Sequence, residues 1–221
     1  MAVDTYRIAM GAYGWQYPAW SDDFYPEDLP EEWQLGFYGN EFPVVMFPAD
    51  YWQQDDAIIA EWIEDSGETL KIICEFGSIE QFLASEERLN ILDTRCYAIA
   101  CKARGSELSV DIISSLSSKP WPVCVELSDD QDLLDSAVLD EMSSRGIGLV
   151  WQGNKMPPRF ENSRLALTKI ERQDVGMRDL RAVVETVLQQ TSDSQQTVII
   201  FCGDPPNIET IRNAQIMLEL L

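Results

Sequence analysis

The chain alternates short apolar runs with longer amphipathic segments along its whole length. Eight of these runs have the length and composition of strands: residues 7–11, 44–47, 70–75, 95–101, 122–127, 147–151, 165–169 and 197–202. Several are almost continuously apolar, which is typical of strands covered on both faces. This alternation predicts a parallel sheet whose strands are connected by crossover helices.

The intervening segments carry apolar residues at helical spacing. We expect helices at 31–40, 55–65, 78–90, 106–117, 130–145, 179–190 and 207–221. Ser78 with Gln81 forms a capping box, and Gly146 is placed to end the fifth helix. Segment 152–163 is polar and contains proline, so we expect a loop in place of a helix after the sixth strand. The count predicts an α/β fold, a compact TIM-type (β/α)8 barrel, with an open doubly wound sheet as the alternative.

The length of 221 residues and the hydrophobic content of 45% fit one barrel domain spanning residues 1–221. No apolar run reaches the roughly 20 residues that a membrane-spanning helix needs. The first residues lack the basic and apolar regions of a signal peptide, so we expect a cytoplasmic protein.

The chain contains no histidine. This excludes Ser-His-Asp and Cys-His triads and the usual zinc sites. The five cysteines form no Cys-x-x-Cys pair and lie in or beside apolar runs, so we expect buried, reduced thiols. Any chemistry would fall to carboxylates, Lys, Arg, Tyr or Cys. Gly-rich phosphate motifs are also missing. We expect no cofactor and no metal; the alternative is a hard divalent cation held by two of the carboxylates, which Lys102 would oppose.

The net charge is -22 at pH 7. A chain this acidic repels the phosphate backbone and anionic lipid, so we expect neither nucleic acid nor membrane as a partner. The remaining partner classes are a small molecule or another protein. The acidic surface itself fits either solubility through net charge or a saline habitat.

Aromatic residues crowd the turn after the first predicted strand. Gly11 and Gly14 are expected to allow a tight turn. Four aromatic side chains of segment 11–20 would form the wall of a pocket mouth and stack on a ligand: Tyr13, Trp15, Tyr17 and Trp20. The alternative is that these rings fill the top of the barrel and bind nothing.

Charged residues occur where several predicted strands end, which is where barrel enzymes hold their sites. The alternation along 122–127 turns Glu126 toward the barrel axis, and Glu75 and Lys102 occupy similar positions on two other strands. We expect these three catalytic candidates to meet, so that Lys102 binds a ligand or shifts the pKa of one acid. The alternative is a buried ion-paired network that fixes strand register.

Two further charges follow the last two predicted strands. Lys169 ends the seventh strand and Asp204 comes just after the eighth. Both are candidates for ligand binding at the same end of the barrel, and the alternative is that each is a solvated loop charge.

The N-terminal motif resembles a known family. Residues 11–20 read Gly-Ala-Tyr-Gly-Trp-Gln-Tyr-Pro-Ala-Trp, followed by Phe24-Tyr25-Pro26. This is similar to the opening of the YecE-like family, also called domain of unknown function seventy-two. The C-terminal Gly203-Asp204 loop and the Asn213-Ala214 pair of the last helix are similar as well. The resemblance implies a barrel related to the TIM type, in a family whose biochemical function is not established.

The sequence also departs from the family's pattern. Met46 stands where the family has an acid, Pro48 replaces an amide, and Gln53 replaces an arginine. Cys202 and Gly203 stand where the family has asparagines, and the family's histidines are missing. The resemblance therefore implies a divergent member with a degenerate site, acting as a binding or interaction module. The alternative is a hydrolase or lyase that uses Glu75, Lys102 and Glu126, and the sequence leaves open whether the protein is an enzyme.

Overall fold

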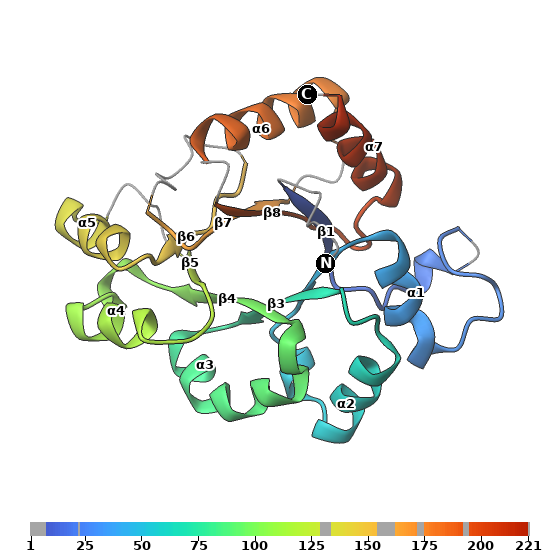
Figure 1. The fold of residues 1–221 in the computed structure, drawn as a ribbon, viewed down its shortest axis with the longest axis horizontal. Helices are drawn as coiled ribbons and strands as arrows, with labels where there is room; N and C mark the ends of the chain where they lie inside the picture. Colours follow the sequence, from blue (N-terminus) through green and yellow to red (C-terminus); the bar gives the residue numbers. More distant parts are fainter. Residues whose placement is uncertain are drawn as a thin grey trace.

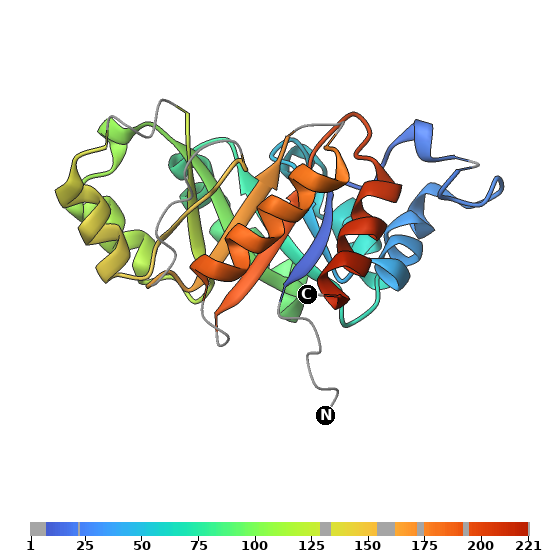
Figure 2. The ribbon, with the colours of Figure 1, turned by 90° about the horizontal axis from the view of Figure 1, so that it is seen from above.

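Eight parallel strands form the centre of the molecule in a computed structural model, which describes residues 8–220 apart from 22, 129–133, 154–161, 172–174 and 192–194. The strands are β1 (Ala9–Tyr13), β2 (Val44–Phe47), β3 (Lys71–Phe76), β4 (Cys96–Ala103), β5 (Val123–Leu127), β6 (Gly148–Leu149), β7 (Leu165–Ile170) and β8 (Gln196–Phe201). Their order in the sheet is β6-β5-β4-β3-β2-β1-β8-β7. Figure 2 shows them running toward the upper edge of that view, which is the end where their carboxyl termini lie.

The barrel closes through a short seam between β6 and β7. One bridge pairs Trp151 with Thr168. The Trp151 N–H donates to the Leu167 carbonyl at 3.0 Å, and the Lys169 N–H donates to the Trp151 carbonyl at 2.7 Å. The fold is thus a nearly closed TIM-type barrel, as the sequence predicts, and the open doubly wound alternative is wrong.

Helices surround the barrel (Figure 1). They are α1 (Gln34–Glu41), α2 (Asp56–Asp65), α3 (Ile79–Ser85), α4 (Val110–Ser117), α5 (Ser136–Ser144), α6 (Met177–Gln190) and α7 (Ile208–Glu219), with short 3-10 helices that include η2 (Glu31–Trp33) and η4 (Glu86–Arg95). All eight predicted strands and all seven predicted helices are present; β2 has the predicted ends, and the ends of the other elements are shifted. Residues 7, 130–133 and 221 of these predictions lie outside the described residues, as does most of the predicted loop at 152–163.

Helix ends form where the sequence provides capping groups. The Ser78 hydroxyl accepts a hydrogen bond from the Gln81 N–H at 3.0 Å and starts α3. Gly146 follows α5 with a φ of 74°, a left-handed conformation that glycine adopts without strain. The Asn207 side chain accepts from the Thr210 N–H and starts α7. Local sequence therefore sets these three boundaries.

Tyr38 of α1 links the first two strands. Its hydroxyl accepts from the Ala12 N–H at 2.7 Å and donates to the Val44 carbonyl at 2.9 Å, although its ring is fully buried. Gly11 makes room for this bridge, because a Cβ there would stand 1.8 Å from the Val44 carbonyl oxygen. Gly11 therefore belongs to β1, and only Gly14, with a φ of 75°, serves the predicted turn.

The sheet separates two apolar regions. The barrel interior is filled by small and aliphatic side chains from alternate strand positions, among them Ala9, Val44, Met46, Ile73, Ala98, Cys124, Leu167 and Val198. A larger core lies between the sheet and the helices. Four cysteines are buried, Cys202 is partly buried, and all five carry free thiols. Among the described residues, no helix is long and apolar enough to cross a bilayer.

Candidate functional site

A cluster of charged side chains closes the carboxyl end of the barrel interior. The Lys169 Nζ atom lies 2.9 Å from Oε1 of Glu75 and 2.8 Å from Oε2 of Glu126. Lys102 approaches the same Glu75 oxygen at 3.6 Å. These side chains come from β3, β4, β5 and β7, at the last inward-facing position of each strand. Four strands therefore meet through one ion-paired network.

Tyr13 at the end of β1 completes the cluster. Its hydroxyl donates to Oε2 of Glu75 at 2.5 Å, so both oxygens of that carboxylate have partners. The Lys169 ammonium also lies 5.2 Å from the centre of the Tyr13 ring. The Tyr17 hydroxyl in turn donates to the Tyr13 carbonyl, which ties the turn after β1 to the cluster.

The cluster is buried at its centre and open at one side. Glu75, Lys169 and Glu126 are 1%, 4% and 7% exposed. Charges at such depth are tolerated only when they are paired. The Lys102 side chain is 40% exposed, so it is the cation of the cluster that solvent reaches.

The surroundings of Glu75, Lys169 and Tyr13 keep each group in the protonation state that it ordinarily has at neutral pH. Burial tends to raise the pKa of Glu75, but Lys169, the Tyr13 hydrogen bond and Lys102 outweigh it, and the pKa falls below the ordinary 4.5. Burial tends to lower the pKa of Lys169, but Glu126 and Glu75 raise it above the ordinary 10.5. Burial and the Glu75 carboxylate raise the pKa of Tyr13 above 10.0. At neutral pH, Glu75 is therefore anionic, Lys169 is cationic and Tyr13 is neutral.

Cys202 lies beside the cluster but is not an activated nucleophile. Burial raises the pKa of its thiol to about 12, although the nearby Lys169 charge acts in the opposite direction. A nucleophilic cysteine needs its thiolate form near neutral pH. Among the described residues, no three Cys, Asp or Glu side chains are grouped as metal ligands.

The sequence placed the three catalytic candidates on the correct face but assigned the wrong central cation. Glu75, Lys102 and Glu126 do point into the barrel, yet Lys169 is the lysine that bridges the two acids. The possibility that Lys169 is a solvated loop charge is wrong, since it lies in β7 and is buried. The alternation of Leu165, Leu167 and Lys169 on one face of β7 was the signal that could have identified it.

The four aromatic candidates after β1 do not lie together. Trp15 is 0% exposed and packs against Phe47, Tyr51 and Trp62 outside the barrel, with ring centroids 4.5, 4.8 and 5.2 Å away. Trp15 therefore does not line a pocket mouth, contrary to what the sequence predicts. Tyr13 belongs to the cluster, and Tyr17 connects it to Trp20, whose ring centroid is 4.8 Å away.

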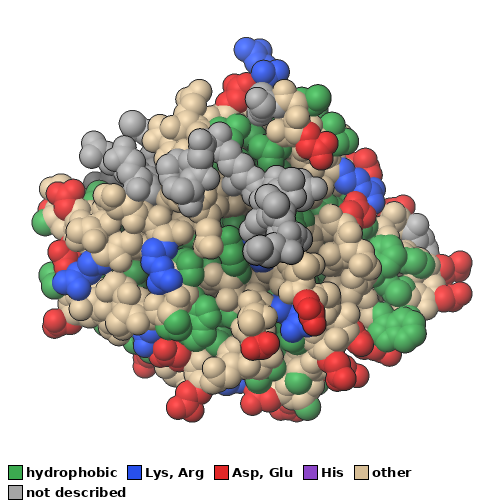
Figure 3. All heavy atoms as spheres, viewed as in Figure 1, with side chains coloured by type: hydrophobic (Ala, Val, Ile, Leu, Met, Phe, Trp, Pro, Cys, Tyr) green, Lys and Arg blue, Asp and Glu red, His purple; other side chains and the backbone are tan. Residues whose placement is uncertain are grey.

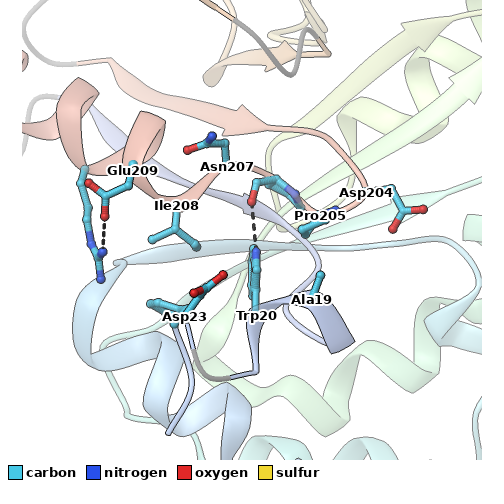
Figure 4. A pocket seen from close by; sticks show the side chains of 11 residues that line it. Ala19, Trp20, Asp23, Asp204, Pro205, Asn207, Ile208 and Glu209 are labelled. Atoms are coloured by element: carbon cyan, nitrogen blue, oxygen red, sulfur yellow. Dashed lines mark hydrogen bonds and ion pairs between the residues drawn. The ribbon is translucent and has the colours of Figure 1, made fainter. Parts of the chain in front are cut away.

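Trp20 and Asp204 line a separate groove of about 520 Å³ beside the start of α7. The Trp20 indole N–H donates to the Pro206 carbonyl at 3.1 Å and joins the turn after β1 to the loop after β8 (Figure 4). Trp20 is almost buried, and Figure 4 shows the Asp204 carboxylate directed away from it. No residue of the charged cluster lines this groove, so the ligand-binding candidates do not form one site.

Comparisons with known proteins agree with this architecture. The family model described as "Protein of unknown function DUF72" matches residues 9–90, from β1 into η4. A crystal structure of a DUF72 family protein from Thermotoga maritima has a TM-score of 0.71 at 17% identity, covering 96% of this chain and 99% of that one. A DUF72 family protein from Enterococcus faecalis has a TM-score of 0.64 at 16% identity, covering 96% of each chain. No curated protein matches with significant similarity.

Proposed function

We propose that this chain, a divergent member of the DUF72 family, is a binding protein whose charged cluster recognises a polar ligand without transforming it. The observation that carries the proposal is Lys169 held between Glu75 and Glu126. General acid–base catalysis works best with groups whose pKa lies near the operating pH. In this cluster the pKa values of Glu75, Lys169 and Tyr13 all move away from neutrality. Groups that keep one protonation state around neutral pH favour ligand recognition over proton transfer.

Lys102 indicates which ligands would fit. Its ammonium is partly exposed, and its 3.6 Å contact with Glu75 is long for a charge-assisted hydrogen bond. An incoming carboxylate or phosphate could therefore attract it without breaking the tighter contacts of Lys169. Tyr13 at the end of β1 and Tyr17 in the turn that follows are both partly exposed, so they offer aromatic surface at the same end of the barrel.

A thermal-shift screen with inorganic phosphate, citrate and a sugar phosphate tests this proposal. We expect at least one anion to raise the melting temperature of the parent protein. Lys102→Met should abolish that shift, and its fold should persist because the side chain is partly exposed. Equal shifts for the parent and the variant, or no shift with any probe, would contradict the proposal.

One observation favours an enzyme as the second candidate. The cluster lies at the carboxyl ends of the strands, where barrel enzymes hold their catalytic groups. A hydrolase or lyase would use Glu126 or Glu75 with a lysine. Turnover of a phosphate or carboxylate ester that is lost in Glu126→Gln would support this candidate and overturn a purely binding role.

A further inference from the structure

Negative charge is concentrated in one part of the chain. Residues 8–70 contain fourteen Asp and Glu residues and no Lys or Arg, so they carry fourteen of the 22 net negative charges. This segment includes η2, α1 and α2, which lie together on one side of the barrel (Figure 1). Of its carboxylates, Glu41 and Asp56 are the ones that form ion pairs within the described part of the chain.

The same side carries an exposed tryptophan beside a groove. Trp33 of η2 is 55% exposed, which is unusual for so large an apolar side chain. A groove of about 440 Å³ lies against it, here called the Trp33 groove, lined by Leu29, Trp33, Gly36, Phe37, Asn40, Asp65, Ser66 and Gly67. Its apolar wall is thus formed by Leu29, Trp33 and Phe37.

Acidic side chains border this groove. Glu31 and Glu32 precede Trp33, and Asp65 is part of the lining; all three are exposed. Arg95 lies at one end, where its guanidinium donates to the carbonyls of Ser66 and Gly67. Figure 3 shows hydrophobic and acidic side chains side by side over α1. The surface therefore combines an apolar groove with a negative rim.

Close packing between helices supports the groove. A Cβ at Gly36 of α1 would stand 2.5 Å from the Asp65 carbonyl at the end of α2, so these backbones approach closely. A groove built on two packed helices is preorganised, which lowers the entropic cost of binding. Exposed tryptophans in such positions are frequent energetic centres of protein interfaces.

We propose that the Trp33 groove is a docking surface for a basic segment of a partner protein. An aliphatic side chain of the partner would enter the groove against Trp33, and neighbouring Lys or Arg residues would meet the acidic rim. Charge complementarity selects this occupant, because nucleic acid, anionic lipid and a second copy of this acidic face would all be repelled. The surface shares no residue with the charged cluster, so the two proposals stand independently.

Binding of a labelled peptide that alternates arginine and leucine, followed by fluorescence anisotropy, tests the proposal. We expect Trp33→Ala to weaken binding by about tenfold or more. Val110→Ala on α4 is the matched control, since Val110 is 60% exposed, and should bind like the parent. A peptide alternating arginine and serine should bind more weakly, and ~0.5 M salt should weaken all binding.

A pair of charge-reversal variants separates the local surface from the net charge. The double variant Glu31→Lys/Glu32→Lys should weaken binding more than Asp111→Lys/Asp140→Lys, whose sites are exposed on α4 and α5 across the barrel. Equal weakening by both variants would overturn the proposal in favour of unspecific attraction. The absence of any binding at ~1 mM peptide would also overturn the proposal. A protein dimer that dissociates on Trp33→Ala would overturn it too, because the groove would then be occupied by a second copy of the chain.

Discussion

Lys169 determines whether the charged cluster is stable. Its ammonium forms ion pairs with both Glu75 and Glu126, and all three side chains are nearly inaccessible to water. In a buried network of this kind, the loss of one partner leaves charges without compensation, which costs more than the intact network contributes. The consequences of changing Lys169 and Lys102 should therefore differ sharply.

Lys169→Met should lower the free energy of unfolding by about 3–5 kcal/mol, because it leaves two carboxylates buried without their shared cation. Lys102→Met should lower it by less than about 1 kcal/mol, since the Lys102 side chain is 40% exposed and the solvent screens its charge. Urea denaturation at neutral pH measures both. Similar losses in the two variants would show that Lys102 is as important for stability as Lys169.

Glu75 makes stability dependent on pH in the acid range. Its pKa in the folded protein lies below the ordinary 4.5, so its contribution is present above that value and is lost as the pH falls through the folded pKa. Lys169, whose pKa is raised, contributes below 10.5 and loses its contribution only at higher, alkaline pH. Stability from this pair should thus be constant around neutral pH.

Glu75→Gln should flatten the acid part of this profile while lowering stability at neutral pH. The measurement is the urea midpoint from about pH 3 to about pH 8 for parent and variant. Glu64→Gln, on the exposed face of α2, provides the control and should keep the parent's profile. A Glu75→Gln profile as steep as the parent's would place the acid sensitivity elsewhere.

At the scale of elements, the bridge made by Tyr38 connects α1 with the pairing of β1 and β2. Tyr38→Phe should lower the free energy of unfolding by about 1–3 kcal/mol, because it removes two buried hydrogen bonds of the Tyr38 hydroxyl. Tyr25→Phe is the control, since the Tyr25 hydroxyl makes a single bond to the Trp15 carbonyl. Urea denaturation should give the smaller loss for Tyr25→Phe, and equal losses would contradict the bridge.

Elements were predictable because their signals are local, whereas the partners within the site were not. A buried strand needs only a run of apolar residues, so β2 was located to the residue. Glu126 was placed on the inward face by alternation alone. The choice of Lys169 over Lys102 depends on barrel closure, which brings β7 opposite β3 and close to β5. The burial of Trp15 likewise depends on the turn at Gly14, whose tertiary surroundings no short pattern records.

At the scale of the whole molecule, the seam between β6 and β7 is the weakest part of the described barrel wall. β6 contains two residues, and one bridge at Trp151 joins the seam. By contrast, β3 and β4 contain six and eight residues and pair from Ile72 to Phe76, across one bulge. Short pairing permits local opening at low free energy. The seam amides should therefore exchange with solvent before those of β3 and β4.

Hydrogen–deuterium exchange with peptide-level readout tests this expectation. The amides of Trp151 and Lys169, whose hydrogen bonds cross the seam, should exchange faster than those of Ile73, Cys74 and Ile99. The latter group serves as the internal control within the same sample. Protection that is uniform around the barrel would show that the side-chain contacts of Lys169 compensate for the short β6.

The ion pair between Lys169 and Glu126 crosses this seam and connects β7 with β5. The same Lys169 ammonium also binds Glu75 on β3. A single replacement at any of these three positions strands a charge in the interior, whereas a concerted replacement by neutral residues does not. Among descendants of a common ancestor, positions 75, 126 and 169 should therefore be inherited as a unit and lost together.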